Sequence, residues 1–313
     1  MLQFIVRRLA FLVFTLLIVS VVIFSVTEVL PGNAARSILG AEATEQSVAA
    51  LEERLGLDRP AWERYVDWLF GAAQGDFGES LRMNVPVGPL ILERLGNSLA
   101  LAGMALLISV PIAITLGVIA GLRQGKPEDH AISVGTLAGV SMPEFVVGVV
   151  LILVFASTLS ILPASSLMEP DQNPFSNPAI LVLPAVTLLA VTLAHTTRMT
   201  RASMISVMQT DYVRTALLKG LPWRRVVLRH ALPNALLPTI TIIAINIGWM
   251  IGGLIVVETV FSYPGLGQLT IRAITNRDVP LMQAVALLIT FIYAFANLIA
   301  DVLYTILNPR IRY

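Results

Sequence analysis

Few side chains in this sequence could carry out covalent or metal chemistry, and they do not form a recognised catalytic set. The 313 residues include three histidines and no cysteine, which excludes thiolate catalysis and cysteine-ligated metal sites for this chain alone. No HExxH or paired-aspartate pattern occurs, and no serine, histidine and aspartate have a spacing that indicates a triad. We therefore predict no catalytic residue, no metal site and no cofactor in this chain.

The composition is typical of a membrane protein. Apolar residues make up 56% of the chain and charged residues 13%, whereas an average soluble domain has about 25% charged residues. The formal net charge is +1, so the chain has no overall basic surface for a nucleic acid. These values argue against a water-soluble enzyme and against a nucleic-acid-binding protein.

Six apolar stretches are long enough to cross a hydrocarbon layer of about 30 Å, which requires roughly 20 helical residues. A cleaved signal peptide is the alternative for the first stretch, but its apolar run is long and continues to Leu30 and Pro31 without a typical cleavage site. The sequence therefore predicts an all-α polytopic protein with six transmembrane helices. The stretches are Leu9–Thr27, Leu95–Leu122, Ala131–Ser157, Pro178–Thr197, Pro238–Val257 and Val279–Ala300.

Lysine and arginine gather in alternate connections between these stretches. Positively charged short loops stay in the cytoplasm, and the short loop between Ser157 and Pro178 has no basic residue. We therefore predict that the N- and C-termini are cytoplasmic. The inner segments then contain Arg7 and Arg8, Arg123 and Lys126, seven basic residues between Arg198 and Arg229, and Arg310 with Arg312.

The long outer connection, residues 30–94, is predicted to be a folded helical cap. It has six arginines against ten acidic residues between Arg36 and Arg94, so its surface is net acidic. Its apolar residues fit a partner-binding surface, but they fit equally well a surface that lies on the membrane or on the helix bundle. The pattern Thr44, Val48, Leu51 and Leu55 predicts one helix ended by Gly56, and Asp58 with Pro60 predicts the start of a second that carries Trp62, Tyr65, Val66 and Leu69.

Two titratable residues, Glu144 and His195, interrupt the apolar stretches. A carboxylate is costly inside a membrane unless it faces water or a partner, so Glu144 is a candidate for a residue that lines a path; a site near the membrane edge or a structural pairing are the alternatives. His195 is next to the predicted inner boundary, where an interfacial role without function is the simpler interpretation. Asn246 is expected to form a hydrogen bond between helices.

The fifth stretch is followed by a turn-rich segment that is a candidate outer gate or re-entrant segment. An ordinary capped loop is the alternative. The residues proposed for this segment are Glu258, Phe261, Tyr263 and Pro264.

The inner loop at residues 198–237 is long, basic and regularly punctuated. Thr210 and Asp211 are N-cap residue types, Gly220 is a natural helix end, and Pro222 prevents continuation. The predicted helix, Asp211 to Lys219, is too short to be stable alone and must be held by other parts of the protein. A basic helix on anionic lipid would explain the arginines but not the punctuation by Gly220 and Pro222.

This loop resembles the EAA loop of ATP-binding-cassette importer permeases, whose pattern is E-A-A, three residues, G, nine residues, then I-x-L-P. Arg214, Thr215 and Ala216 stand at the E-A-A positions, and 230–233, His-Ala-Leu-Pro, stand at I-x-L-P. Arginine replaces the usual glutamate, in a form that is similar to the RTA-x-x-KG of the dipeptide and oligopeptide permease branch. Further segments similar to that branch are LPGNAA at 30–35, QGDFGESL at 74–81, SMPEFVVG at 141–148, VETVFSYPGLGQL at 257–269 and NPRIRY at 308–313.

The resemblance implies one membrane subunit of an ATP-driven, binding-protein-dependent importer of the type I permease fold, in a prokaryotic inner membrane. It implies a second, homologous permease subunit, two cytoplasmic ATPase subunits that bind ATP and magnesium, an extracytoplasmic substrate-binding protein and contact with lipid. The substrate would be a di- or oligopeptide or a related small solute. A proton-coupled secondary transporter is the alternative, but Glu144 alone makes a poor proton relay.

On this interpretation the chain divides into an N-terminal transmembrane helix (1–29), an extracytoplasmic cap (30–94) and a permease core (95–313). The short helix in the inner loop would move with the ATPases, and Pro222 and Pro233 would interrupt its connection to the fifth helix. The residues expected to couple to the ATPases are Asp211, Tyr212, Arg214, Thr215, Ala216, Lys219, Gly220, Leu221 and Pro222.

Overall fold

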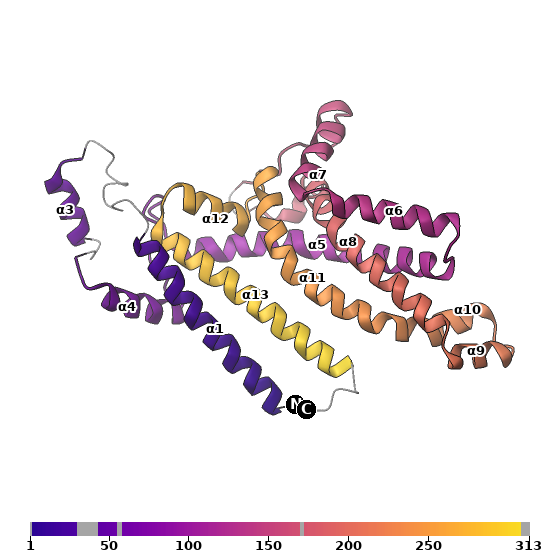
Figure 1. The fold of residues 1–313 in the computed structure, drawn as a ribbon. Coiled ribbons are helices and arrows are strands. Elements are labelled where there is room, and N and C mark those ends of the chain that lie inside the picture. The colour runs from indigo at the N-terminus through magenta and orange to yellow at the C-terminus, as the bar shows by residue number, and fades with distance from the viewer. Residues whose placement is uncertain (1, 30–42, 55–57, 170–171, 308–313) are drawn as a thin grey trace. The chain divides into compact units, whose positions relative to one another are not determined.

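The computed structural model describes residues 2–29, 43–54, 58–169 and 172–307. Within these ranges the regular structure is helical, apart from one isolated bridge between Glu79 and Pro86. This confirms the predicted all-α class for the described residues (Figure 1). The chain forms two compact units, Met1–Ser98 with Pro264–Phe295 and Leu99–Tyr263 with Ala296–Tyr313.

The first unit contains the N-terminal helix, the cap helices and the helices that follow Pro264. Its elements are α1 (Leu2–Val29), α3 (Glu45–Arg54), α4 (Ala61–Ala73), the start of α5 (Val87–Leu122), α12 (Leu266–Thr275) and most of α13 (Val279–Leu307). The apolar core of this unit joins α5, α12 and α13 through buried residues that include Ile91, Leu269 and Leu281. The two helices predicted between residues 30 and 94 are present as α3 and α4.

Polar contacts fix the connection between α4 and α5 in this unit. Asp278 is almost completely buried and its carboxylate accepts hydrogen bonds from the Ser80 hydroxyl and from the backbone N–H of Leu81, the latter at 3.2 Å. Asn97 donates to the carbonyl of Pro264 at 2.9 Å. Ser80 and Leu81 end the QGDFGESL segment, so this segment has a structural partner that its sequence did not indicate.

The second unit is a helical bundle in which α8 and α11 pack along each other. Close approach of α5 to α8 depends on glycine, because a Cβ added at Gly117 would lie only 2.5 Å from Thr200 Cβ. The elements are the rest of α5, α6 (Pro127–Ser141), α7 (Glu144–Leu151), the π-helical η1 (Ile152–Thr158), the 3-10 turn η2 (Pro174–Ser176), α8 (Ala179–Met208), α9 (Asp211–Leu218), α10 (Trp223–Arg225), the π-helical η3 (Val226–Ala231) and α11 (Leu232–Val260).

Four helices in the described residues are long and apolar enough to cross a membrane, at Gln3–Thr27, Val87–Leu122, Trp223–Val260 and Val279–Ile299. The regions of the other two predicted spans are bent pairs of helices, and the described residues contain six spans only if each bent pair is one span. The pair Pro127–Ser141 and Glu144–Thr158 is bent by 103°, and Ala179–Ala190 with Thr192–Met208 by 43°. The sharper bend occurs at Met142 and Pro143, because proline disfavours the helical conformation of the preceding residue.

The connection from α9 to the fifth span differs from the expected one at Pro233. The helical path runs unbroken from Trp223 to Val260. The break between α9 and the fifth span therefore ends at Pro222, and Pro233 lies inside the helix. The π-helical segment η3 ends at Ala231, two residues before Pro233. Its hydrogen bonds have a different register from those of an α-helix, and this change occurs next to a proline, which has no backbone N–H to donate. The predicted helix end at Gly56 and the LPGNAA and NPRIRY segments lie outside the described residues.

Candidate functional site

The short helix predicted from Asp211 to Lys219 is present as α9, Asp211–Leu218, with Thr210 at its N-cap position and Lys219 at its C-cap position. The Thr210 hydroxyl donates to the carbonyl of Val207 at 2.6 Å, so this residue marks the helix start without capping it through its side chain. At the other end Gly220 has φ +74° and donates to Leu217, and Leu221 donates to Ala216. Glycine adopts this left-handed conformation without strain, which explains why α9 stops there.

One face of α9 is anchored in the core of its own unit. Val213 and Ala216 are buried in a cluster with Met204 of α8 and with Val226 and Ala231 of η3. The sequence analysis included Ala216 among the residues expected to couple to the ATPases. In the structure its side chain faces inward, because it is on the same helical face as Val213. The burial of these side chains supplies the support that an eight-residue helix lacks in isolation.

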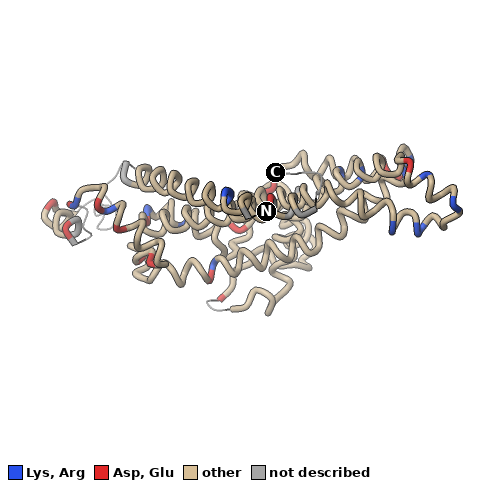
Figure 2. The backbone as a smooth tube through the Cα atoms, turned by 90° about the horizontal axis from the view of Figure 1, so that it is seen from below, with Lys and Arg blue, Asp and Glu red and all other residues tan. Residues whose placement is uncertain are grey.

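The opposite face of α9 is exposed and mixes apolar and basic residues. Leu218 is 80% exposed and Tyr212 is 44% exposed, and Arg214, Thr215 and Lys219 are also exposed. Lysine and arginine residues gather at the α9 and α10 end of the second unit (Figure 2).

A buried ion pair ties α8 to the turn between α5 and α6 at this same end of the unit. Arg201 of α8 donates to the Asp129 carboxylate at 2.5 and 2.7 Å. The same carboxylate accepts the backbone N–H of Gly125 at 2.9 Å and the hydroxyl of Ser133 at 3.4 Å. The Asp129 side chain is 3% exposed and that of Arg201 31% exposed. The contact holds three helices together near α9.

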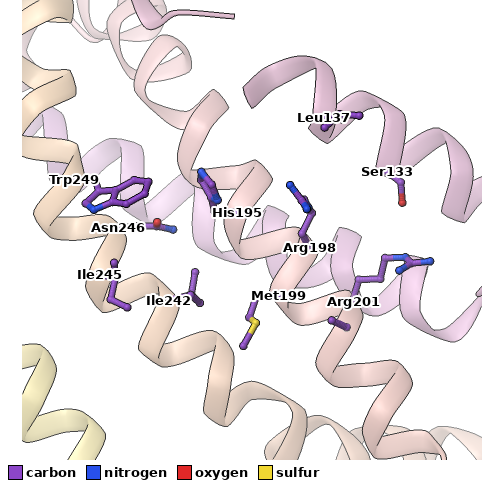
Figure 3. Close-up of a pocket in the computed structure, with 11 residues that line it drawn as sticks. Ser133, Leu137, His195, Arg198, Met199, Arg201, Ile242, Ile245, Asn246 and Trp249 are labelled. Carbon is purple, nitrogen blue, oxygen red and sulfur yellow. The ribbon is translucent and has the colours of Figure 1, made fainter. Parts of the chain in front are cut away.

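A cavity of about 820 Å³ opens between α6, α8 and α11, within the second unit. The rings of His195 and Trp249 meet edge to face on its wall, with their centres 5.7 Å apart. Asn246 donates to the Thr196 hydroxyl at 3.2 Å, which confirms the expected hydrogen bond between helices, and Asn246 also lines the cavity. Figure 3 shows the side chains of His195, Asn246 and Trp249, with Arg198 about one turn further along α8.

The cavity is positively charged on its α8 side. Arg198 is exposed and has no acidic partner in the described part of the chain, whereas Arg201 is held by Asp129. Sequence reasoning missed Arg198 and Trp249 and assigned His195 an interfacial role. The i, i+3 spacing of His195 and Arg198, which places both on one face of α8, is a signal that could have found Arg198. The sequence carries no comparable signal for Trp249, which comes from α11.

Glu144 does not lie within a straight helix, because it is the first residue after the bend between α6 and α7. Its carboxylate packs against α11 at Gly253. A Cβ added at Gly253 would lie 2.6 Å from both carboxylate oxygens. The side chain is partly buried. The structure therefore places Glu144 at a helix contact, and it does not line the cavity around His195.

The residues predicted for a gate surround the end of α11. Glu258, Phe261 and Tyr263 are fully buried, and the Phe261 carbonyl accepts a hydrogen bond from the Ser166 N–H at 2.7 Å. Burial, and then the nearby Glu258 charge, raises the pKa of Tyr263 above its ordinary value. Pro264 begins the second part of the first unit. The segment is thus a packed turn.

Residues 113–313 match the family described as the binding-protein-dependent transport system inner membrane component. Residues 1–102 match the N-terminal membrane component of the same systems. This chain belongs to that permease family. The permease is the membrane subunit of an ATP-driven, binding-protein-dependent importer, and it is not itself an enzyme. The family implies that nucleotide is bound by partner ATPases, and it implies a multi-pass location in the inner membrane.

Relatives of the permease match it from end to end. It is 39% identical to a probable peptide ABC transporter permease protein, y4tP, of Sinorhizobium fredii (strain NBRC 101917 / NGR234), over 99% of each chain. It is 37% identical to the glutathione transport system permease protein GsiC of Escherichia coli (strain K12), over 100% of each chain. A crystal structure of an amino acid ABC transporter with histidines shares the fold, with a TM-score of 0.50 and 16% identity over 71% of this chain and 94% of that one.

Proposed function

We propose that this permease forms half of a translocation pathway for di- or oligopeptides or related small solutes, and that α9 couples the pathway to cytoplasmic ATPase subunits. The observation that carries the proposal is the construction of α9. One face is fixed in the core by Val213 and Ala216, and the opposite face projects Leu218 into solvent. When a partner displaces a helix built in this way, the displacement is transmitted to the elements packed against its buried face, here α8 and η3.

The displacement of α9 would be transmitted along α8. Met204 of α8 packs against α9 in the same buried cluster, and Arg198 lies about 9 Å further along the helix axis at 1.5 Å per residue. The Asp129 ion pair joins this part of α8 to the turn between α5 and α6. Displacement of α9 would therefore move one wall of the cavity relative to α11.

The charge of the cavity supports a solute with a free carboxylate. Arg198 supplies a cation and the Asn246 side chain a polar group, while Trp249 offers an apolar surface. Guanidinium groups bind carboxylates with two parallel hydrogen bonds. The peptide and glutathione named for the relatives y4tP and GsiC are solutes of this chemical class.

The proposed assembly contains a second homologous permease subunit, two cytoplasmic ATPase subunits and an extracytoplasmic substrate-binding protein. The distribution of basic residues in the short loops supports cytoplasmic termini, a cytoplasmic α9 and an extracytoplasmic segment at 30–94. In this arrangement the ATPases meet the exposed face of α9. The residues proposed to contact them are Tyr212, Arg214, Thr215, Leu218 and Lys219, with Asp211, Gly220, Leu221 and Pro222 shaping the helix ends.

The test replaces the exposed tip of α9. Leu218→Glu places a charge where the side chain is 80% exposed, so folding should be unaffected, while an apolar contact with an ATPase should be lost. We expect uptake of a radiolabelled dipeptide by the reconstituted complex to fall about tenfold or more, as for loss of an interface anchor worth roughly 1.4 kcal/mol or more. Leu218→Met keeps the apolar tip and should retain uptake. Normal uptake by a fully assembled Leu218→Glu complex would refute the coupling role.

A further inference from the structure

Helix α4 of the cap has three distinct faces. Trp62, Val66 and Phe70 are spaced by four residues and form an apolar face on which they are 67%, 39% and 64% exposed. Arg59, just before the helix, forms ion pairs with Glu63 and Asp67, at 3.4 and 2.8 Å, and these residues make up a polar face. None of the described residues therefore covers the apolar face, and it is not the face that packs on α1.

The third face packs on α1. The Tyr65 hydroxyl and the Ser20 hydroxyl are 2.9 Å apart. Phe24 of α1 packs against the rings of Tyr65 and Trp68, with ring centres 5.4 and 6.1 Å apart. These contacts fix both the position of α4 along α1 and the rotation of α4 about its own axis.

The contact with α1 determines the depth of α4 relative to the membrane. The apolar span of α1 extends from Gln3 to Thr27, and Ser20 lies about 10 Å inside its end at Thr27, at 1.5 Å per residue. At this level α1 exposes Val22 and Val26, which a spanning helix presents to lipid. Helix α4 is thus held beside a part of α1 that would lie at the level of the acyl chains if α1 spans the membrane.

From this placement we propose that α4 is an interfacial helix whose Trp62, Val66 and Phe70 face is embedded in the lipid leaflet where α1 ends. Amphipathic helices of this kind bury their apolar face about 5–10 Å below the headgroups, which agrees with the depth of the Ser20 contact. The polar face, with the Arg59 ion pairs, then meets the headgroups and water. Tryptophan and tyrosine are also the residues enriched at this level of a membrane.

This embedding has a consequence for the cap. With its apolar face in lipid, α4 fixes the end of α1 against the membrane surface and cannot offer that face to a soluble partner. Contacts between the two cap helices and a soluble protein would then use the polar side of α4 or α3. The inference concerns the fold of the cap and holds whichever solute is transported.

Cysteine labelling can separate lipid from water because the chain has no native cysteine. Phe70→Cys and Asp67→Cys form a matched pair, since the two native side chains are 64% and 62% exposed on the same helix. Trp62→Cys and Glu63→Cys form a second pair. Each full-length variant is reconstituted in vesicles of phosphatidylethanolamine and phosphatidylglycerol and treated with a charged, membrane-impermeant maleimide that is present on both sides.

We expect the cysteines at 70 and 62 to react about tenfold or more slowly than those at 67 and 63, because a charged reagent does not enter the hydrocarbon layer and the thiolate is disfavoured there. All four should react equally after unfolding in dodecyl sulfate. Equal rates at 70 and 67 in vesicles would overturn the proposal. Slow labelling at 70 that appears only after addition of a purified substrate-binding protein or of the second permease would also overturn it, since a protein would then be the occupant.

A second measurement does not depend on substituting the apolar face. A variant that retains Trp62 as its only tryptophan, with phenylalanine at the other three positions, is placed in vesicles of brominated phosphatidylcholine. Bromine atoms near the top of the acyl chains should quench Trp62 fluorescence strongly, and aqueous iodide should quench it weakly. The reverse pattern would show that Trp62 is in water and would refute the embedding.

Discussion

Close packing of α5 on α8 can be tested with one methyl group. A Cβ at Gly117 would lie 2.5 Å from Thr200 Cβ and 2.7 Å from the Thr197 carbonyl oxygen. Carbon atoms in contact are ordinarily about 3.5–4.0 Å apart, so Gly117→Ala requires a separation of roughly 1.0–1.5 Å. The Thr197 carbonyl belongs to the backbone and cannot rotate away. The two helices must therefore move apart.

The loss of stability expected for Gly117→Ala is judged against a matched control on the same helix. Gly103 also lies in α5, but a Cβ added there meets no atom within 4 Å. Both substitutions gain the same helix propensity, about 0.5–1 kcal/mol, which cancels when the two variants are compared. Overpacking costs about 1–3 kcal/mol, so we expect Gly117→Ala to be less stable than Gly103→Ala by about that amount.

The assay is denaturant unfolding of the purified permease in detergent, followed by circular dichroism, with solute uptake measured in parallel. Gly103→Ala should unfold at the same or a higher denaturant concentration than the wild type, and Gly117→Ala at a lower one. Uptake should fall in the Gly117→Ala variant, because α8 carries Arg198 and would shift relative to α11. Equal stability of the two variants would refute the close contact between α5 and α8.

Two further predictions concern carboxylates. Asp129→Ala should destabilise the permease by about 1–3 kcal/mol in the same unfolding assay, because the Gly125 N–H and the Arg201 guanidinium lose their acceptor; an unchanged stability would contradict the role of the ion pair. Gly253→Ala should displace the Glu144 carboxylate, whereas Gly252→Ala should be tolerated because no atom lies within 4 Å of its added Cβ. The Gly253→Ala penalty should disappear in a Glu144→Ala background, and a penalty that persists would locate the clash elsewhere.

The predictions that succeeded rest on signals contained in short segments of chain. The four unbent spans follow from runs of apolar residues, because a helix in lipid satisfies its own backbone hydrogen bonds. The end of α9 at Gly220 follows from the left-handed conformation that only this residue type adopts readily. The bend before Glu144 had a local signal as well, in Pro143, which a count of apolar residues does not register.

The candidate site was less accessible to such reasoning. Ala216 and Leu218 are two residues apart in a predicted helix, and the sequence did not show that one is buried and the other exposed. That difference depends on where α8 and η3 lie. Likewise, the sequence did not indicate that the packing of α8 beside α11 places Trp249 against the ring of His195.

The sequence by itself determined the membrane class, the helical spans, the short punctuated helix and the resemblance to the permease family. These properties depend on composition and on interactions between residues a few positions apart. Tertiary structure alone decided the Asp129 and Arg201 pair, 72 residues apart, and the Ser80 and Asp278 contact, 198 residues apart. It also decided which residues line the cavity and which face of α4 packs on α1. The physical reason is that a buried polar group can be satisfied by any partner the fold brings within hydrogen-bond distance, and helix periodicity does not specify which partner that is.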